Sequence, residues 1–199
     1  APAVEHAPAV SATPEAAPTA QASAVREDTS ADSTPGVPRT LEARLATPSA
    51  TEAEGLLRHG DAAGALALAD AAGSRGEATP RWALVRADAL RALGRSAEAA
   101  DAYDTAARVD ARHRAEAGYA AANLRFRALH DTSGALRSLD ASGATGSSLA
   151  ERALTLRVKL LRAEGREADA RADATEYLTR FPEGTSAAFM QSVVGTPAE

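Results

Sequence analysis

The stretch that decides the fold is residues 87–106, which read ADALRALGRSAEAADAYDTA. Small apolar residues recur before a glycine at position 94, and the pattern resumes after it at Ala99, Tyr103 and Ala106. Apolar residues three or four positions apart lie on one face of a helix, and glycine commonly ends a helix. The stretch therefore predicts two helices joined by a tight turn, with small side chains where the helices approach each other.

The same pattern returns along the chain at a nearly constant interval. Ala65, Ala99, Ala135 and Ala170 mark corresponding places, with successive spacings of 34, 36 and 35 residues. A period of about 34 residues with two helices per unit is the length at which helical hairpins stack on one another. We therefore expect an all-α fold, an α-solenoid of about four hairpins plus a C-terminal capping helix at residues 185–194.

These hairpins resemble the tetratricopeptide repeat over roughly residues 50–183. The residues that carry the resemblance are Ala53, Leu56, Gly60, Ala65, Ala69 and Ala72 in the first unit, Ala87, Leu90, Gly94, Ala99, Tyr103 and Ala106 in the second, and Val158, Leu161, Gly165, Ala170, Ala174 and Tyr177 in the fourth. The third unit departs from the pattern, with His130 and Asp131 at its turn and Leu139 and Ser142 on its second helix. The resemblance implies a protein that binds other proteins and has no catalytic residues of its own.

The composition divides the chain into two parts. Seven of the ten prolines lie in residues 1–48, which are otherwise rich in alanine, serine and threonine. Proline removes a backbone donor and biases the preceding residue away from helix, so we expect a disordered Ala/Pro-rich linker there. The repeat domain is then expected at residues 49–195. The sequence also allows a short helix at residues 40–45, which would dock on the first hairpin.

Local motifs predict where several helices begin. The stretches 51–54 (TEAE) and 148–151 (SLAE) match the capping box, in which a hydroxyl and a glutamate three residues later satisfy free amide groups. Thr79 followed by Pro80 predicts an N-cap and a first helical residue. The Gly- and Ser-rich stretch 142–147 predicts an irregular connector before the fourth hairpin.

The overall composition argues against several kinds of function. A net charge of −5 disfavours a nucleic-acid partner, and the absence of cysteine excludes disulfides and thiolate metal sites. His6, His59, His113 and His130 lack the spacing of metal ligands, and no glycine-rich nucleotide-binding motif is present. We expect no cofactor, no metal and no enzymatic activity. No stretch approaches the ~20 apolar residues that cross a bilayer, although a segment preceding Ala1 could hold an anchor.

Basic residues stand near the end of each predicted first helix: Arg58, Arg91, Arg127 and Arg162. First helices line the groove in tetratricopeptide repeats, so the resemblance implies that Arg91, Arg127 and Arg162, together with Lys159, bind an acidic peptide. The alternative is that the helix macrodipole alone favours these cations, by ~0.3 to 1 kcal/mol each. Trp82 is likewise either an interface anchor or, as we favour, the filling of the joint between the first two hairpins.

The combined prediction is a non-catalytic protein–protein interaction scaffold. The Ala/Pro linker, the repeats and the ending Tyr177–Pro182 (YLTRFP) resemble the C-terminal part of bacterial FecR-like signalling proteins and other periplasmic repeat proteins. This resemblance implies a place in the cell envelope, with the cytoplasm as the alternative. Two other functions stay open: a structural subunit that self-associates through its repeats, and an accessory domain of an enzyme whose active site lies outside this chain.

Overall fold

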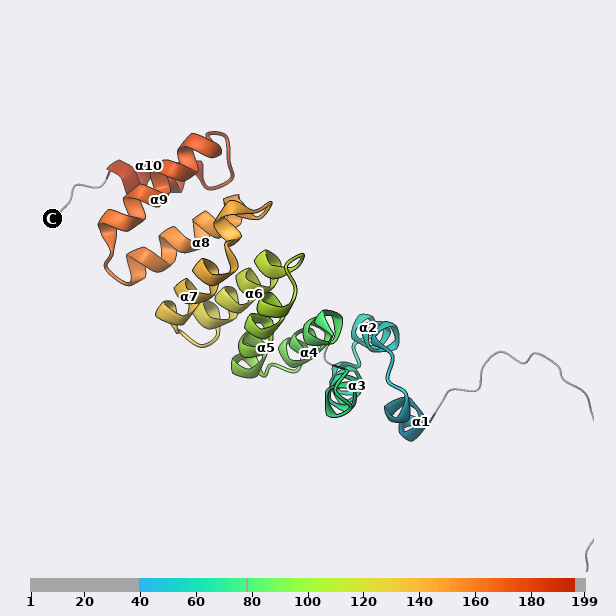
Figure 1. The fold of residues 1–199 in the computed structure, drawn as a ribbon. Coiled ribbons are helices and arrows are strands. Elements are labelled where there is room, and N and C mark those ends of the chain that lie inside the picture. Colours follow the sequence, from blue (N-terminus) through green and yellow to red (C-terminus); the bar gives the residue numbers. More distant parts are fainter. Residues whose placement is uncertain (1–39, 78, 196–199) are drawn as a thin grey trace, which may run out of the picture. The chain divides into compact units, whose positions relative to one another are not determined.

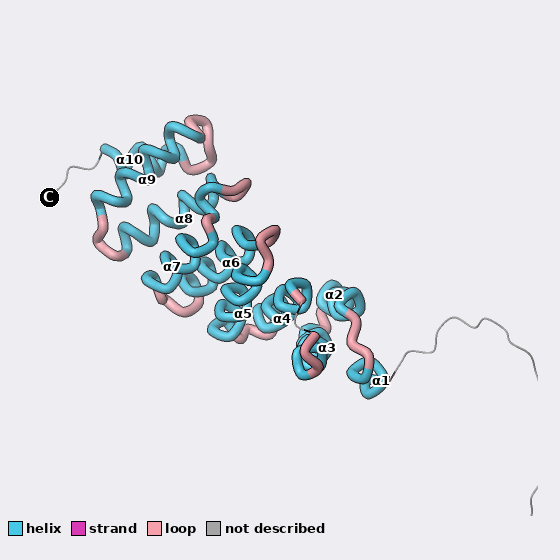
Figure 2. Tube along the Cα trace, in the orientation of Figure 1, coloured by secondary structure: helices cyan, strands magenta, loops and turns pink. Residues whose placement is uncertain are grey.

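The computed structural model describes residues 40–77 and 79–195, and these residues form helices, turns and loops without a strand (Figure 2). The expected disorder of residues 1–39 lies outside the described part. The helices are α1 (Leu41–Ala46), α2 (Ala50–Arg58), α3 (Ala62–Ser74), α4 (Pro80–Ala92), α5 (Ser96–Val109), α6 (Arg114–Arg127), α7 (Thr132–Ser142), the short 3₁₀ helix η1 (Ala144–Gly146), α8 (Ala150–Ala163), α9 (Glu167–Arg180) and α10 (Ala187–Gly195) (Figure 1).

Consecutive helices from α2 to α10 pack against one another in chain order (Figure 1). The pairs α2–α3, α4–α5, α6–α7 and α8–α9 are the four expected hairpins, and α10 packs on α9 as the expected terminal helix. The four marker alanines each occupy the fourth position of a second helix, and all four are fully buried. The prediction of an all-α, solenoid-like helical repeat is confirmed.

The turn inside each hairpin requires one residue with a left-handed backbone. Glycine supplies it in three hairpins, with φ of +83° at Gly60, +74° at Gly94 and +71° at Gly165. In the third hairpin His130 takes this conformation, with φ +53°. That turn also contains four residues, 128–131, where the other three turns contain three. The extra turn residue contributes one residue to the longer spacing between Ala99 and Ala135.

Both predicted capping boxes are wrong. Helix α2 begins at Ala50 after Ser49, and α8 begins at Ala150 after Leu149, without a side-chain cap at either start. The two glutamates bind other helices instead: Glu54 accepts hydrogen bonds from Arg81, and Glu151 accepts one from the Tyr177 hydroxyl. A carboxylate near the start of a helix can reach a neighbouring helix as well as its own N-terminus, and here both glutamates bind donors outside their own helix.

Two other local predictions have different outcomes. Thr79 caps α4 as expected, because its hydroxyl accepts from the Trp82 amide at 3.5 Å, and Pro80 is the first helical residue. The stretch 142–147 is only partly irregular, since Ser142 ends α7 and residues 144–146 form η1. The left-handed backbone of Gly143 separates the two elements.

The expected short helix exists as α1, inside the residues assigned to the linker. Thr40 caps it, and Leu45 packs against the first part of the hydrophobic core. The Arg75 guanidinium at the end of α3 donates to the carbonyl groups of Leu45 and Ala46, which are the last residues of α1 and otherwise lack helical partners. These contacts attach α1 to the first hairpin.

The hydrophobic core is divided at α6. One cluster of buried apolar side chains extends from α2 to Ala121, and a second begins at Ala122 and continues to α10. Trp82 is buried in the first cluster, next to the joint of the first two hairpins, which agrees with the structural interpretation of this residue. Two polar residues of α7, Ser138 and Ser142, are buried as well.

Candidate functional site

The four cations expected to bind an acidic peptide are exposed, but they have different surroundings. They are Arg91, Arg127, Lys159 and Arg162. Arg91 donates from Nε to the Tyr103 hydroxyl at 3.0 Å, and its Nη2 lies 3.5 Å from Asp88. Arg162 Nε lies 3.6 Å from a Glu167 carboxylate oxygen. These two arginines are therefore already engaged with their own or the partner helix of their hairpin.

Arg127 and Lys159 come together at a hollow between α6 and α8, which we call the α6–α8 hollow. It has a volume of about 400 Å³. Its lining consists of Tyr119, Phe126, Arg127, Glu151, Arg152, Thr155, Leu156, Lys159, Thr185 and Ser186. Neither Arg91 nor Arg162 lines it, so the structure brings together two of the four predicted site residues.

The backbone explains why the arginines near the ends of the first helices do not share one surface. The amide that closes each turn donates to the carbonyl of Leu56, Leu90, Arg125 or Leu161, which fixes the register of the four first helices. Arg91 and Arg162 come one residue after that carbonyl, whereas Arg58 and Arg127 come two residues after it. Side chains of successive residues point in directions about 100° apart around a helix. The four arginines therefore alternate between two faces.

The α6–α8 hollow carries a local excess of positive charge. Within the described residues, neither Arg127 nor Arg152 forms an ion pair, and Lys159 Nζ lies 5.8 Å from the centre of the Phe189 ring. The one lining carboxylate, Glu151, accepts hydrogen bonds from Tyr177 at 2.9 Å and from the Thr185 amide at 2.8 Å. These hydrogen bonds, that of Tyr177 first, lower the pKa of Glu151. Three cations therefore face a single, already bound carboxylate.

Sequence reasoning missed Arg152, Tyr119 and Phe126 as parts of this site. A signal for them existed, because Arg152 precedes Lys159 by seven residues, as Tyr119 precedes Phe126. Residues seven apart lie on nearly the same face of a helix. The sequence alone does not show that the α8 face with Arg152 and the α6 face with Tyr119 border the same hollow.

The hollow between α2 and α4 provides a contrast. It is larger, about 690 Å³, but its charges are largely paired. Arg81 binds Glu54 with a nitrogen–oxygen distance of 2.6 Å, and His113 lies 2.5 Å from Asp110. The hydrogen bond from His113 lowers the pKa of Asp110. Among the described residues that line it, Arg112 is in no ion pair, but three carboxylates, those of Glu54, Asp88 and Asp110, lie around the same space. This region therefore has no local excess of positive charge.

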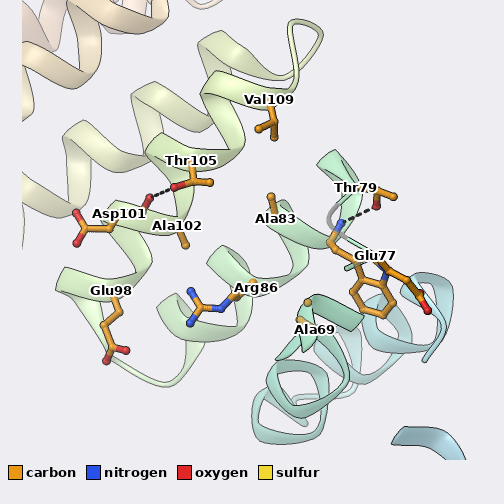
Figure 3. Close-up of a pocket in the computed structure, with 12 residues that line it drawn as sticks. Ala69, Glu77, Thr79, Ala83, Arg86, Glu98, Asp101, Ala102, Thr105 and Val109 are labelled. Atoms are coloured by element: carbon orange, nitrogen blue, oxygen red, sulfur yellow. Dashed lines mark hydrogen bonds between the residues drawn. The ribbon is translucent and has the colours of Figure 1, made fainter. Parts of the chain in front are cut away.

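A third hollow is mainly apolar and lies between α3 and α5 beside α4, with a volume of about 410 Å³ (Figure 3). Ala69, Ala83 and Ala102 face it, and Val109 stands at one end of its α5 wall (Figure 3). Two of the charged residues at its border are engaged elsewhere: Arg86 binds Asp70 at 2.9 Å, and Asp101 binds Arg125 at 2.7 Å. Small side chains on the facing helices leave this space open.

The described residues contain no group of three or more histidine, aspartate or glutamate side chains placed to hold a metal ion. None of the helices in the same part of the chain is long and apolar enough to span a membrane. Comparisons of the chain with protein-family models, with curated proteins and with solved structures give no match, so the tetratricopeptide and FecR-like resemblances stay predictions.

Proposed function

We propose that this chain is a non-catalytic protein–protein interaction scaffold whose α6–α8 hollow binds an acidic segment of a partner protein. The observation that carries the proposal is the excess of cations at this hollow, where Arg127, Arg152 and Lys159 line one space with a single carboxylate. The whole chain has a net charge of −5, so this positive region is a local feature against an acidic background. Such a region attracts anionic partners and orients them.

The lining also suits a peptide rather than a bare ion. Tyr119 and Phe126 offer apolar and aromatic surface beside the cations, and both side chains are only partly buried. Aromatic side chains and arginine are enriched where proteins bind one another. An acidic segment with an apolar residue beside its carboxylates would satisfy both parts of the lining.

Two double variants with the same change in charge test the proposal. Arg127→Gln/Lys159→Gln removes two cations from the hollow, and Arg91→Gln/Arg162→Gln removes two cations that do not line it. The probe is a fluorescein-labelled peptide of glutamate and leucine, with the glutamine-for-glutamate peptide as its control, and fluorescence anisotropy reports binding to the full chain. We expect Arg127→Gln/Lys159→Gln to weaken binding by about tenfold or more and to reduce its salt dependence.

Equal affinities of the two double variants would contradict the assignment of the hollow. The glutamine peptide should bind weakly to all proteins, since it lacks the charge that the hollow recognises. If it binds as tightly as the glutamate peptide, the cations do not select the partner.

Self-association through the repeats remains the alternative function. The observation in its favour is that Leu93, Val109, Leu129 and Val194 are exposed, although they lie in different parts of the fold. Sedimentation velocity over a range of concentrations separates the two functions. A mass that stays that of one chain would eliminate the alternative, and a stable dimer or larger assembly would favour it.

The cellular setting is part of the same proposal. The FecR-like layout of linker and repeats supports a role in a bacterial envelope or signalling assembly, where the linker would set the reach of the scaffold. Fractionation of the native host into periplasm, membranes and cytoplasm would test this placement. A clear turnover by the isolated chain in a broad hydrolase screen would instead favour an enzymatic role.

A further inference from the structure

A second positively charged hollow lies between α5 and α7 beside α6, and we call it the arginine hollow. It has a volume of about 380 Å³. The residues around it are Asp104, Ala107, Arg108, Arg114, Arg125, Gly134, Arg137, Ser138, Ala141 and Ser142. Four arginines therefore line one space, and Asp104 is the only carboxylate among these lining residues.

Arg125 occupies a position where the other three hairpins have a leucine. Its carbonyl accepts the turn hydrogen bond that Leu56, Leu90 and Leu161 accept in their hairpins. Its side chain is 13% exposed and is fully engaged: Nη1 binds Asp104 and donates to the Ser138 hydroxyl at 2.7 Å, and Nη2 donates to Asp101 at 2.7 Å. Arg125 therefore fixes the wall of the hollow and neutralises Asp104.

Arg108, Arg114 and Arg137 are left without a carboxylate partner. Arg108 donates to the Thr105 hydroxyl at 2.9 Å, and Arg114 makes a long contact of 3.4 Å with the Ala107 carbonyl. No ion pair of the described residues includes any of the three arginines, in contrast to Arg125 with its three acidic neighbours. All three are exposed, so their guanidinium groups can turn toward a ligand.

The space itself arises from small side chains. Gly134, Ser138 and Ser142 come from successive turns of α7, and Ala107 faces them from α5. The hydroxyl groups of Ser138 and Ser142 donate to the carbonyls of Gly134 and Leu139, so they satisfy their donors within α7. The volume lies within the range of small-molecule sites.

We propose that the arginine hollow binds a small ligand carrying a diphosphate group, held by Arg108, Arg114 and Arg137. Guanidinium groups match phosphate oxygens in pairs of parallel hydrogen bonds, and a diphosphate offers enough oxygens and charge for three of them. A long polyanion is disfavoured because the rest of the chain is acidic. This site is separate from the α6–α8 hollow, and the proposal does not depend on the peptide-binding function.

Isothermal titration of the full chain with pyrophosphate tests the proposal. We expect saturable binding that Arg114→Gln/Arg137→Gln weakens by at least about tenfold, since two charge-assisted contacts are lost. Arg91→Gln/Arg162→Gln is the control with the same change in charge, and Arg127→Gln/Lys159→Gln removes two cations from the other hollow. Both controls should bind pyrophosphate like the wild type.

A second variant tests the site without removing an arginine. Ala141 is exposed and lines the hollow, so Ala141→Glu places a carboxylate among the arginines and should abolish binding while α7 stays folded. Circular dichroism verifies folding in each variant. Titration with ADP, which carries the group as an ester, distinguishes an esterified ligand from free diphosphate. The proposal is supported if the wild type binds pyrophosphate or ADP and if Arg114→Gln/Arg137→Gln and Ala141→Glu weaken or abolish that binding.

Three results would overturn the proposal. The first is the absence of saturable binding of both pyrophosphate and ADP, and the second is equal affinity of the wild type and Arg114→Gln/Arg137→Gln. The third is equally tight binding of tricarballylate, a ligand with three carboxylates, because the hollow would then bind anions without preferring phosphate. None of these results bears on peptide binding at the α6–α8 hollow, so the two proposals fail independently.

Discussion

Replacement of Gly118 by alanine should destabilise the protein, although alanine is the better helix former. Gly118 lies in α6 where this helix contacts α7. A Cβ atom there would collide with Cβ and Oγ of Ser142 and would lie 3.0 Å from the Ser138 carbonyl oxygen. Rotation of Ser142 cannot relieve the collision, because its Cβ and the Ser138 carbonyl are both fixed to the α7 backbone. The helices must therefore move apart.

The expected magnitude follows from two opposing contributions. Overpacking typically costs about 1 to 3 kcal/mol. The direct collision with the Ser142 Cβ places this case at the upper end, about 2 to 3 kcal/mol, and the higher helix propensity of alanine returns about 1 kcal/mol. We expect a net loss of about 1 to 2 kcal/mol, which lowers the Tm by about 2 to 8 °C for a domain of this size. Thermal unfolding followed by circular dichroism measures the change.

Gly55→Ala is the matched control. Its Cβ would lie 3.7 Å from Arg58 Nη2, an ordinary contact, so only the gain in helix propensity of about 1 kcal/mol remains and the Tm should rise. Adding Ser142→Gly to Gly118→Ala removes the colliding Cβ and should recover part of the loss, giving a measurable coupling between the two positions. A Gly118→Ala protein as stable as the wild type would refute the close approach of α6 and α7.

Three further changes are expected to have definite outcomes. His130→Gly should stabilise the protein by about 0.5 to 1 kcal/mol in urea unfolding, because the left-handed backbone at this turn costs histidine more than glycine; an unchanged or lower urea midpoint would argue against this conformation. Arg125→Ala should cost about 2 to 3 kcal/mol by the same assay, since it leaves the partly buried Asp104 without its cation; a loss below about 0.5 kcal/mol would show that the pair is weak. Glu151 has a lowered pKa in the fold, mainly through the Tyr177 hydroxyl and then Thr185, so its stabilising effect is complete above the ordinary pKa of 4.5 and disappears as the pH falls through the lowered value. The urea midpoints of wild type and Glu151→Gln should therefore differ at neutral pH and converge in acid, and a pH-independent difference would contradict this role of the carboxylate.

The departures of the third hairpin show how far local sequence reasoning extends. His130 and Asp131 mark an unusual turn in the sequence, and the structure has an additional turn residue there. The sequence did not show that this residue shifts the register of α6, so that Arg125 replaces a core leucine and Arg127 moves to another face. The register depends on which carbonyl closes the turn, and that hydrogen bond forms only when both helices are in place.

The two mistaken capping boxes show that side-chain hydrogen bonds also depend on tertiary contacts. The sequences TEAE and SLAE satisfy the local pattern, but Glu54 and Glu151 bind donors that are 27 and 26 residues away in the chain. A local motif specifies what a side chain can bind within its own turn. It does not include the competing donors that another helix brings within reach.

The sequence by itself determined the helical hairpins, their number, the positions of their tight turns and the terminal helix. These features follow from helical periodicity, from the small size of alanine and from the backbone freedom of glycine, all of which act over a few residues. Only the tertiary structure decided which cations share a hollow. A shift of one residue along a helix changes the direction of a side chain by about 100°, and packing of the helices brings together residues from separate parts of the chain. Arg127, Arg152 and Lys159 meet for that reason, and so do Arg108, Arg114 and Arg137.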